Sequence, residues 1–331
     1  MKHFDVFNGD ADGICALHQL RLASPVDSVL VTGMKRDIAL LDRVDAAAGD
    51  RVTVLDVSAD VNRTALFALL DRGAWVQYFD HHFAGHLPAH PRLHASIDTS
   101  AETCTSLLVD EYLHGLHPLW AIVGAYGDDL AQPAEAYADR LALGETQRRR
   151  LRELGEAIAY NAYGDCEADL IIHPRELYRA LAPYVDPLMF MDDAPICRRL
   201  SEQKSADLGL AALAEPELAL AGATIYILPD DPWARRVRGL MANELAKRYA
   251  DLAHAVLTHN RDGGYTVSVR APRVSPSGAD AVCRKFHAGG GRLGAAGINH
   301  LPQDALPRFA REMDRAFPEP GMAVPPQARD I

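Results

Sequence analysis

Cysteine is scarce in this sequence, and it contains neither a long apolar run nor an excess of basic residues. The five cysteines are odd in number, far apart and without CxxC spacing: Cys15, Cys104, Cys166, Cys197 and Cys283. This argues against a disulfide framework or a zinc ribbon and fits a reducing compartment. No run of about 18 apolar residues is present, so no membrane span is expected. No apolar stretch follows a basic start, so no secretory signal is expected and the cytoplasm is the expected location.

Acidic residues outnumber basic ones by 45 to 34, which gives a formal net charge of -11. An acidic surface argues against a protein that coats long nucleic acid, although a local basic pocket could still bind a short phosphorylated ligand. With 331 residues, the chain is long enough for two domains, each with a core of its own.

Short apolar runs alternate with helical patterns in the first eighty residues, which predicts βαβ units and a mainly parallel sheet. We expect strands at 3–7, 28–32, 51–55 and 73–79, and helices at 14–22 and 65–71. Helical pattern then dominates from 100 to 182, and a charged helical stretch at 197–213 is a candidate connector between domains.

A second α/β region begins near Leu218. Its expected strands are 223–228, 253–258 and 265–270, with a hairpin through 260–264. Its expected helices are 233–249 and 279–286. A glycine-rich loop is expected at Gly289, and the proline-rich tail from Pro318 is expected to be poorly ordered.

Three acidic motifs lie where predicted strands end. Asp10 and Asp12 belong to an NGDADG segment between a strand and a helix, and Asp56 and an Asp-His-His triplet at 80–82 follow later strands. The carboxyl ends of parallel strands meet at one edge of a doubly wound sheet, so we expect these motifs to converge. Gathered carboxylates and imidazoles with no nearby basic partner repel one another, and a pair of divalent metal ions is the simplest way to hold them together.

Each motif also has an ordinary structural explanation. The first could be an Asp-rich turn with a helix cap at Asp12, and Asp56 could be a cap or a loop residue. A single histidine could be a satisfied surface or core residue, whereas a triplet at a strand end favours a functional site. Prolines separate the histidines at 86, 90 and 94, which favours a loop there. The first motif is not a GxGxxG fingerprint, which argues against a nicotinamide site.

The segment 124–129 closes an apolar stretch and offers one more carboxylate, either Asp128 or Asp129. Its alternative role is a helix C-terminus at Gly127.

The second region carries a candidate phosphate grip. Gly289, Gly290 and Gly291 would expose backbone N–H groups, and Arg292 would add a guanidinium, with Arg270 as a second clamp. The alternative is a flexible loop with a solvated arginine.

Taken together, these motifs resemble the DHH phosphoesterase superfamily, which is named for its Asp-His-His triplet. The resemblance implies a DHH domain at 1–190, a helical linker at 191–215, a substrate-binding domain at 216–320 and a tail at 321–331. It implies an α/β fold with a mainly parallel N-terminal sheet flanked by helices and a smaller C-terminal α/β domain. It also implies an active site in the cleft between the domains and two divalent ions, Mn²⁺ in preference to Mg²⁺.

The resemblance assigns roles to individual residues. The expected metal ligands are Asp10 for the first ion, Asp12, His81 and Asp128 for the second, and Asp56 as the bridge between them. Asp80 and His82 are the candidate catalytic residues, with His82 facing the phosphate. Arg270 and the segment 289–292 correspond to the grip on the substrate phosphate.

Three positions depart from the family's pattern. Val6 stands where oligoribonuclease-like members carry a histidine ligand, and Asn8 stands where RecJ-type exonucleases carry an aspartate. Asn8 is a possible additional ligand through its carbonyl oxygen, but it has no charge, so a weaker first ion is expected. Arg292 stands where histidine is usual, which keeps anion binding but removes a titratable group.

The resemblance implies phosphoester hydrolysis by metal-activated water. We expect an oligoribonuclease-like phosphodiesterase or phosphatase that acts on a small nucleotide or a short oligonucleotide. Neither a membrane nor a long duplex is an expected partner, and a homodimer is left open. Two alternatives remain: a RecJ-like exonuclease on longer single strands, and a nucleotide-binding regulator whose metal site is weakened by Val6 and Asn8.

Overall fold

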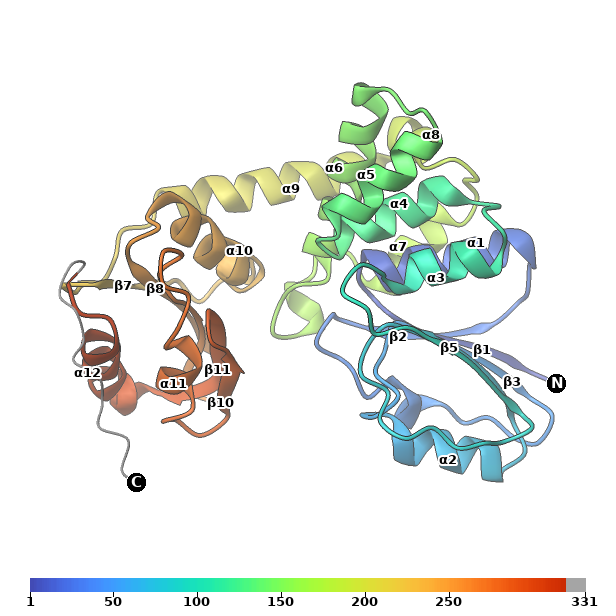
Figure 1. Ribbon diagram of the computed structural model, residues 1–331, viewed down its shortest axis with the longest axis horizontal. Helices are drawn as coiled ribbons and strands as arrows, with labels where there is room; N and C mark the ends of the chain where they lie inside the picture. The colour runs from blue at the N-terminus through green and yellow to red at the C-terminus, as the bar shows by residue number, and fades with distance from the viewer. Residues whose placement is uncertain (320–331) are drawn as a thin grey trace. The chain divides into compact units, whose positions relative to one another are not determined.

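The computed structural model describes residues 1–319, so the predicted tail at 321–331 lies outside the described residues. The chain forms two compact units, which meet along the sequence at Lys204 and Ser205. This point lies inside a long helix, α9 (Pro195–Ala212), drawn in yellow in Figure 1. No helix among the described residues is long and apolar enough to cross a membrane.

The first unit is built on a parallel five-stranded sheet in the order β2-β1-β3-β4-β5. The strands are β1 (His3–Asn8), β2 (Val29–Gly33), β3 (Arg51–Leu55), β4 (Trp75–Asp80) and β5 (Leu93–Ile97). The central strands are buried along nearly their whole length because helices cover both faces of the sheet. The predicted mainly parallel α/β sheet is confirmed.

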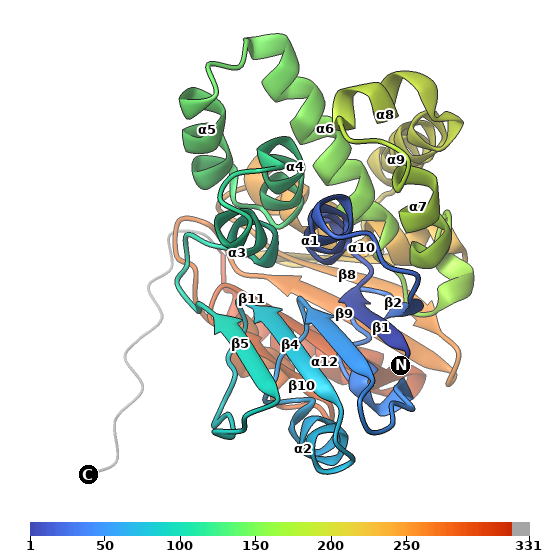
Figure 2. The same cartoon turned by 90° about the vertical axis from the view of Figure 1, so that its right-hand side faces the viewer.

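Helices lie on both faces of this sheet, as Figures 1 and 2 show. Helices α1 (Ala11–Ala23) and α3 (Thr105–Tyr112) pack on one face, and α2 (Arg63–Asp71) packs on the other. Helix α1 is buried from Ala11 to Leu20 because α4 covers the side that does not face the sheet. The other helices of this unit are α4 (Pro118–Gly127), α5 (Ala131–Arg140), α6 (Glu145–Asn161), α7 (Pro174–Leu181) and α8 (Pro187–Asp193).

The strand order defines a switch point in the sheet. From β1 the chain goes to β2 on one side and then to β3 on the other, so the loops after β1 and β3 leave the sheet in opposite directions. A crevice forms at such a point, outside the carboxyl ends of the strands, and it is where α/β sheets bind ligands. Asp10, Lys35, Asp56 and His81 all follow strands at this edge.

The second unit has a mixed six-stranded sheet in the order β10-β11-β9-β8-β7-β6, in which only β7 and β8 are parallel. The strands are β6 (Leu218–Ala219), β7 (Ala223–Leu228), β8 (Ala253–Asn260), β9 (Gly264–Arg270), β10 (Gly289–Arg292) and β11 (Ala295–Pro302). Helix α10 (Pro232–Arg248) packs on one face, and α11 (Ala279–Cys283) and α12 (Leu306–Ala316) contribute to a separate core. The predicted hairpin at 260–264 joins β8 to β9.

Three local predictions are wrong. Helix α1 is capped by Asp10, not by Asp12, because the side chain of Asp10 accepts hydrogen bonds from the N–H groups of residues 12 and 13. His94 lies in strand β5, since this edge segment pairs with β4. The glycine-rich segment at Gly289 is not a loop: its four residues pair antiparallel with β11 as strand β10.

Candidate metal centre

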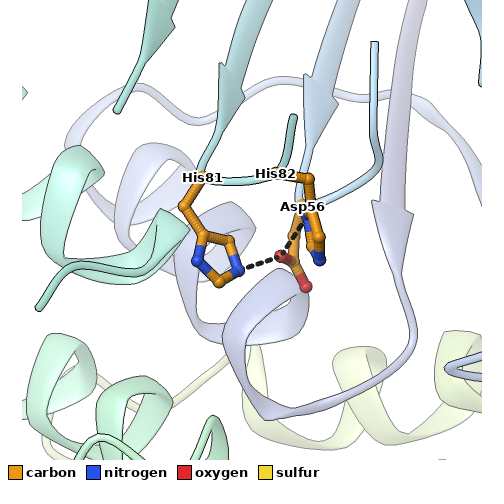
Figure 3. A group of neighbouring side chains, drawn as sticks. All are labelled: Asp56, His81 and His82. Carbon is orange, nitrogen blue, oxygen red and sulfur yellow. Dashed lines mark ion pairs between the residues drawn. The ribbon is translucent and has the colours of Figure 1, made fainter. Parts of the chain in front are cut away.

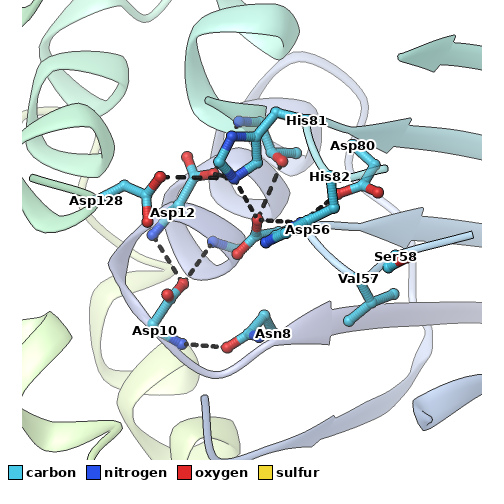
Figure 4. A network of polar contacts seen from close by, with 12 residues as sticks. Asn8, Asp10, Asp12, Asp56, Val57, Ser58, Asp80, His81, His82 and Asp128 are labelled. Atoms are coloured by element: carbon cyan, nitrogen blue, oxygen red, sulfur yellow. Dashed lines mark hydrogen bonds and ion pairs between the residues drawn. The ribbon is translucent and has the colours of Figure 1, made fainter. Parts of the chain in front are cut away.

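Residues far apart in the sequence converge at the carboxyl edge of the parallel sheet (Figure 4). Asp10 and Asp12 stand at the start of α1, Asp56 follows β3, and His81 follows β4. Asp128 arrives from the C-terminal end of α4, where it is the capping residue. The three carboxylates from the strand ends are buried. The structure therefore brings together the five residues that were predicted to hold metal.

The imidazole of His81 is at the centre of this group. Its Nε2 atom lies 3.4 Å from Asp56 Oδ1, 3.5 Å from Asp128 Oδ2 and 3.9 Å from Asp12 Oδ2. Among the described residues, this buried nitrogen has no hydrogen-bond partner. A buried nitrogen of this kind is costly unless it binds something, and here three carboxylates surround it.

The donor atoms fit a divalent cation. Ligands that each lie about 2.1 Å from one ion are about 3 to 3.5 Å from one another, close to the separations around His81 Nε2. Two overlapping groups of donors come within reach of a single ion, one of Asp12, His81 and Asp128 and the other of Asp56, His81 and His82. Figure 3 shows both rings of the second group against the Asp56 carboxylate. Asp129 belongs to neither group of the described residues.

The N-terminus of α3 positions the carboxylate of Asp12. The backbone N–H of Thr105 donates to Asp12 Oδ2 at 2.8 Å, and that of Ser106 donates to Asp12 Oδ1 at 2.7 Å. The hydroxyl of Ser106 also donates to the backbone carbonyl of Asp12. The two N–H groups at the start of α3 therefore fix the direction of the Asp12 carboxylate.

Asp10 has a different environment, because one of its oxygens meets a lysine. Its Oδ1 accepts the two backbone hydrogen bonds that cap α1, and its Oδ2 accepts from Lys35 Nζ at 2.7 Å. The same ammonium lies 3.3 Å from Asp128 Oδ1. Burial acts to raise the pKa of Asp10, but the attraction of Lys35 outweighs it and the pKa is lowered. Burial likewise opposes the charge on Lys35, yet Asp10 and Asp128 raise its pKa well above the usual value.

The remaining carboxylates repel one another. Burial, and then the charges of Asp10, Asp12 and Asp128, raise the pKa of Asp56 well above its usual value. Burial and the charge of Asp12 raise the pKa of Asp128 to about 6. Asp56 also has a left-handed backbone with φ of 59°, a conformation in which few residues other than glycine, asparagine and aspartate are found. Strain and repulsion at one residue are typical of a functional site.

Asp80 and His82 form a separate pair beside this centre. Asp80 is fully buried, and its Oδ1 lies 2.8 Å from His82 Nδ1. The hydrogen bond that His82 donates to Asp80 is the largest influence on the pKa of the imidazole and raises it. His82 Nδ1 is also 3.8 Å from Asp56 Oδ1, and the His82 side chain is about half exposed, at 47%. The pair therefore presents an oriented, readily protonated ring at the rim of the centre.

Two of the positions that depart from the family's pattern have structural roles. Val6 is fully buried in the core between the sheet and α2. Asn8 is buried as well: its Oδ1 accepts from the backbone N–H of Asp10, and its Nδ2 donates to the carbonyl of Lys35. Both polar atoms of Asn8 are thus engaged with the backbone.

The candidate phosphate grip lies in the second unit. Arg270 in β9 and Arg292 in β10 are both paired with Ala295, which lies in the strand between them. Directly paired residues share a face of an antiparallel sheet, so both arginines lie on one face with a small residue between them. Arg270 Nε donates to Asn243 Oδ1 on α10. Because 289–292 pairs as a strand, part of its backbone N–H groups are engaged with β11.

Sequence reasoning missed Lys35, Thr105 and Ser106. Lys35 follows β2 by two residues, so the rule that carboxyl ends of parallel strands converge applies to it as well, and this signal was present. Thr105 and Ser106 begin a helix with no acidic or histidine residue to mark them, so only the folded chain reveals their contact with Asp12.

Compared by sequence, the chain matches no protein-family model and no curated protein. Compared by structure, it is similar to the exonuclease RecJ bound to manganese, at 18% identity and a TM-score of 0.61, over 96% of this chain and 91% of that one. It is also similar to PggH, a pGpG-specific phosphodiesterase from Vibrio cholerae, at 14% identity and a TM-score of 0.54, over 95% and 98% of the two chains. RecJ from Thermus thermophilus in complex with Mn²⁺ matches at 18% identity and a TM-score of 0.55, over 96% of this chain and 53% of that one.

At these identities the likeness shows a shared fold. The chain has the fold of the DHH phosphoesterases over nearly its whole length, and the predicted resemblance is confirmed for the fold.

Proposed function

We propose that this protein is a divalent-metal-dependent phosphoesterase that hydrolyses a small nucleotide or a short oligonucleotide. The observation that carries the proposal is the buried Nε2 of His81, which has no hydrogen-bond partner within residues 1–319 and lies among the carboxylates of Asp12, Asp56 and Asp128. The fold shared with an exonuclease and a phosphodiesterase supports the same reaction class.

The residues of the centre have two roles, metal binding and contact with the phosphate. Asp12, Asp56, His81 and Asp128 would hold a divalent ion, and α3 keeps Asp12 in place. When bound, the ion would supply positive charge to the phosphoryl group and lower the pKa of water. The ring of His82, oriented by Asp80, donates a hydrogen bond or a proton to an oxygen of the phosphate.

We assign a phosphate-binding role to the C-terminal unit. Arg270 and Arg292 on one face of its sheet offer two guanidinium groups for phosphate oxygens. The residues Gly289, Gly290 and Gly291 form an edge strand, which leaves N–H groups on its outer side for an anion.

The proposal is tested with purified protein, stripped of metal and then supplied with Mn²⁺, Mg²⁺ or neither. The substrates are pGpG, di- to pentanucleotides, a nucleoside 3′,5′-bisphosphate and pyrophosphate. We expect metal-stimulated release of nucleotide or phosphate from at least one of them. Failure of Mn²⁺ and Mg²⁺ to stimulate turnover of any substrate would contradict the proposal.

The matched variants are Asp56→Asn and Asp60→Asn. Asp56 lies in the centre, whereas Asp60 lies in the following turn and pairs with Arg63. Asparagine tolerates the left-handed backbone of residue 56, so the change removes charge with little strain. We expect Asp56→Asn to abolish metal-stimulated turnover and Asp60→Asn to leave it within about twofold of the wild type.

A second candidate function is end-directed digestion of longer single strands, which the similarity to RecJ over 91% of its chain favours. The net charge of -11 favours the shorter substrate. A single strand of some thirty nucleotides, labelled at either end, separates the two: stepwise shortening from one end supports the exonuclease. The preference for Mn²⁺ and a cytoplasmic location remain predictions, and a homodimer remains open.

The number of ions also remains a prediction. The resemblance implies two, with Asp10 holding the first and Asp56 between them. Tight binding of a nucleotide without hydrolysis, by a protein that binds metal weakly, would instead support the regulator.

A further inference from the structure

The position of Lys35 bears on how many metal ions the centre takes. Its ammonium lies 2.7 Å from Asp10 Oδ2 and 3.3 Å from Asp128 Oδ1, inside the ring of carboxylates. A lysine at this position contributes a permanent positive charge beside Asp10.

Two hydrogen bonds hold the backbone of Lys35 in place. Its N–H donates to the carbonyl of Ala162, just after α6, at 3.1 Å. Its carbonyl accepts from Asn8 Nδ2 at 3.2 Å. Hydrogen bonds to the residue after α6 and to Asn8 of β1 therefore hold the backbone of Lys35 in place. The ammonium extends from this fixed backbone to Asp10.

Lys35 competes with a metal ion for the one oxygen of Asp10 that the cap of α1 leaves available. Oδ1 accepts from the N–H groups of residues 12 and 13, and Oδ2 accepts from Lys35. A metal ion on Oδ2 has to lie about 2.1 Å from it, which is inside the space that the ammonium occupies. An ammonium and a divalent cation so close together also repel each other strongly.

The other donors near Asp10 are engaged too. Asn8 uses both polar atoms of its side chain on the backbone. Among the described residues, both groups that could hold an ion include His81, and neither includes Asp10.

We propose that the centre holds one divalent ion, bound by His81 and by carboxylates from among Asp12, Asp56 and Asp128, and that the ammonium of Lys35 occupies the cation position at Asp10. Asp128 serves both cations, since its Oδ1 faces Lys35 and its Oδ2 faces His81. This inference depends on the proposed function, and it narrows the number of ions from two to one.

The first test counts Mn²⁺ ions and does not depend on activity. Metal-free protein is titrated with Mn²⁺ by calorimetry, with and without inorganic phosphate, and bound metal is then measured by elemental analysis. Electron paramagnetic resonance distinguishes an isolated Mn²⁺ from a magnetically coupled pair. We expect one equivalent per chain and the spectrum of an isolated ion.

Three variants test the role of the lysine. Lys35→Met removes the charge and frees Asp10 Oδ2, so we expect a second equivalent of Mn²⁺ to bind. Lys35→Arg keeps the charge, so the count should stay at one. Lys204→Met, which removes another partly buried lysine paired with a carboxylate, Glu156, is the matched control and should also stay at one.

The outcomes separate this inference from the proposed function. Two equivalents or a coupled pair in the wild type would overturn the inference and leave a metal-dependent phosphoesterase. A folded Lys35→Met variant that still binds one ion would also overturn it. A wild type that binds no Mn²⁺ would overturn both. The wild-type count and spectrum decide the matter even if Lys35→Met fails to fold.

Discussion

At the scale of single residues, Asp80 is a fully buried acidic residue that is absent from both groups of donors around His81. One of its oxygens accepts from His82, and within residues 1–319 the other has no hydrogen-bond partner. Burying a carboxylate that makes only one hydrogen bond costs free energy. We therefore infer that Asp80 orients the His82 ring and raises its pKa.

We therefore expect Asp80→Asn to lower kcat by about 10- to 100-fold, the usual cost of removing the partner that orients a functional histidine. KM and the number of bound Mn²⁺ ions should change little, because Asp80 acts through His82. The control is Asp98→Asn, an exposed aspartate beyond the end of β5. If Asp80→Asn bound less Mn²⁺ but its metal-loaded fraction turned over substrate normally, Asp80 would be a metal ligand instead.

The sequence was sufficient to group the acidic and histidine residues that follow predicted strands. Asp10, Asp12, Asp56 and His81 could be grouped because parallel strands end at one edge. The choice between Asp128 and Asp129 could not be made, since it depends on how α4 ends. The premise of a centre without a basic partner was wrong, because Lys35 lies against Asp10.

At the scale of helices and strands, the centre depends on a close approach between α4 and the start of α3. A Cβ atom added to Gly124 in α4 would lie 2.2 Å from Ser106 Oγ and 3.3 Å from Asp12 Oδ1. Ser106 in turn holds Asp12 through two hydrogen bonds. The glycine thus lets the two helices meet where Asp12 is positioned.

Gly124→Ala should displace Ser106 and with it Asp12. We expect Mn²⁺ affinity to fall at least about tenfold and the stability of the first unit to fall by about 1–3 kcal/mol from overpacking. Calorimetric titration and urea unfolding measure the two effects. Gly239→Ala in α10 is the control, because beyond the adjoining turns of α10 no described atom lies within 4 Å of the added Cβ, and alanine favours a helix. Normal Mn²⁺ affinity in Gly124→Ala would show that Ser106 does not position Asp12.

The segment 289–292 shows the limit of local prediction at this scale. Three glycines have little strand propensity, so a loop was the reasonable expectation. Pairing with β11 overrides that preference, and the small residues opposite, Ala296 and Gly297, leave space for the glycine backbone. The edge strand β5 was also missed, although its residues alternate between apolar and polar, because the prolines just before it favoured a loop. Its pairing with β4 determines its conformation.

At the scale of the whole molecule, the candidate metal ligands all belong to the first of two units, and each unit has its own core. The predicted phosphate grip belongs to the second. A ligand that binds the native state stabilises only the unit that forms its site. A metal ion at this centre should therefore stabilise the first unit alone.

Scanning calorimetry of the metal-free protein should resolve two unfolding transitions, one for each unit. Mn²⁺ at about 100 times its dissociation constant adds about 2.7 kcal/mol to the first unit, which raises the Tm of a unit of this size by about 5–10 °C. The Tm of the second unit should stay constant. In Asp56→Asn the metal-dependent shift should vanish, while the metal-free first unit should unfold at the same or a higher temperature, because a repelled buried carboxylate has been removed. Equal shifts of both transitions in the wild type would mean that metal binding involves both units, contrary to a centre built within residues 1–204.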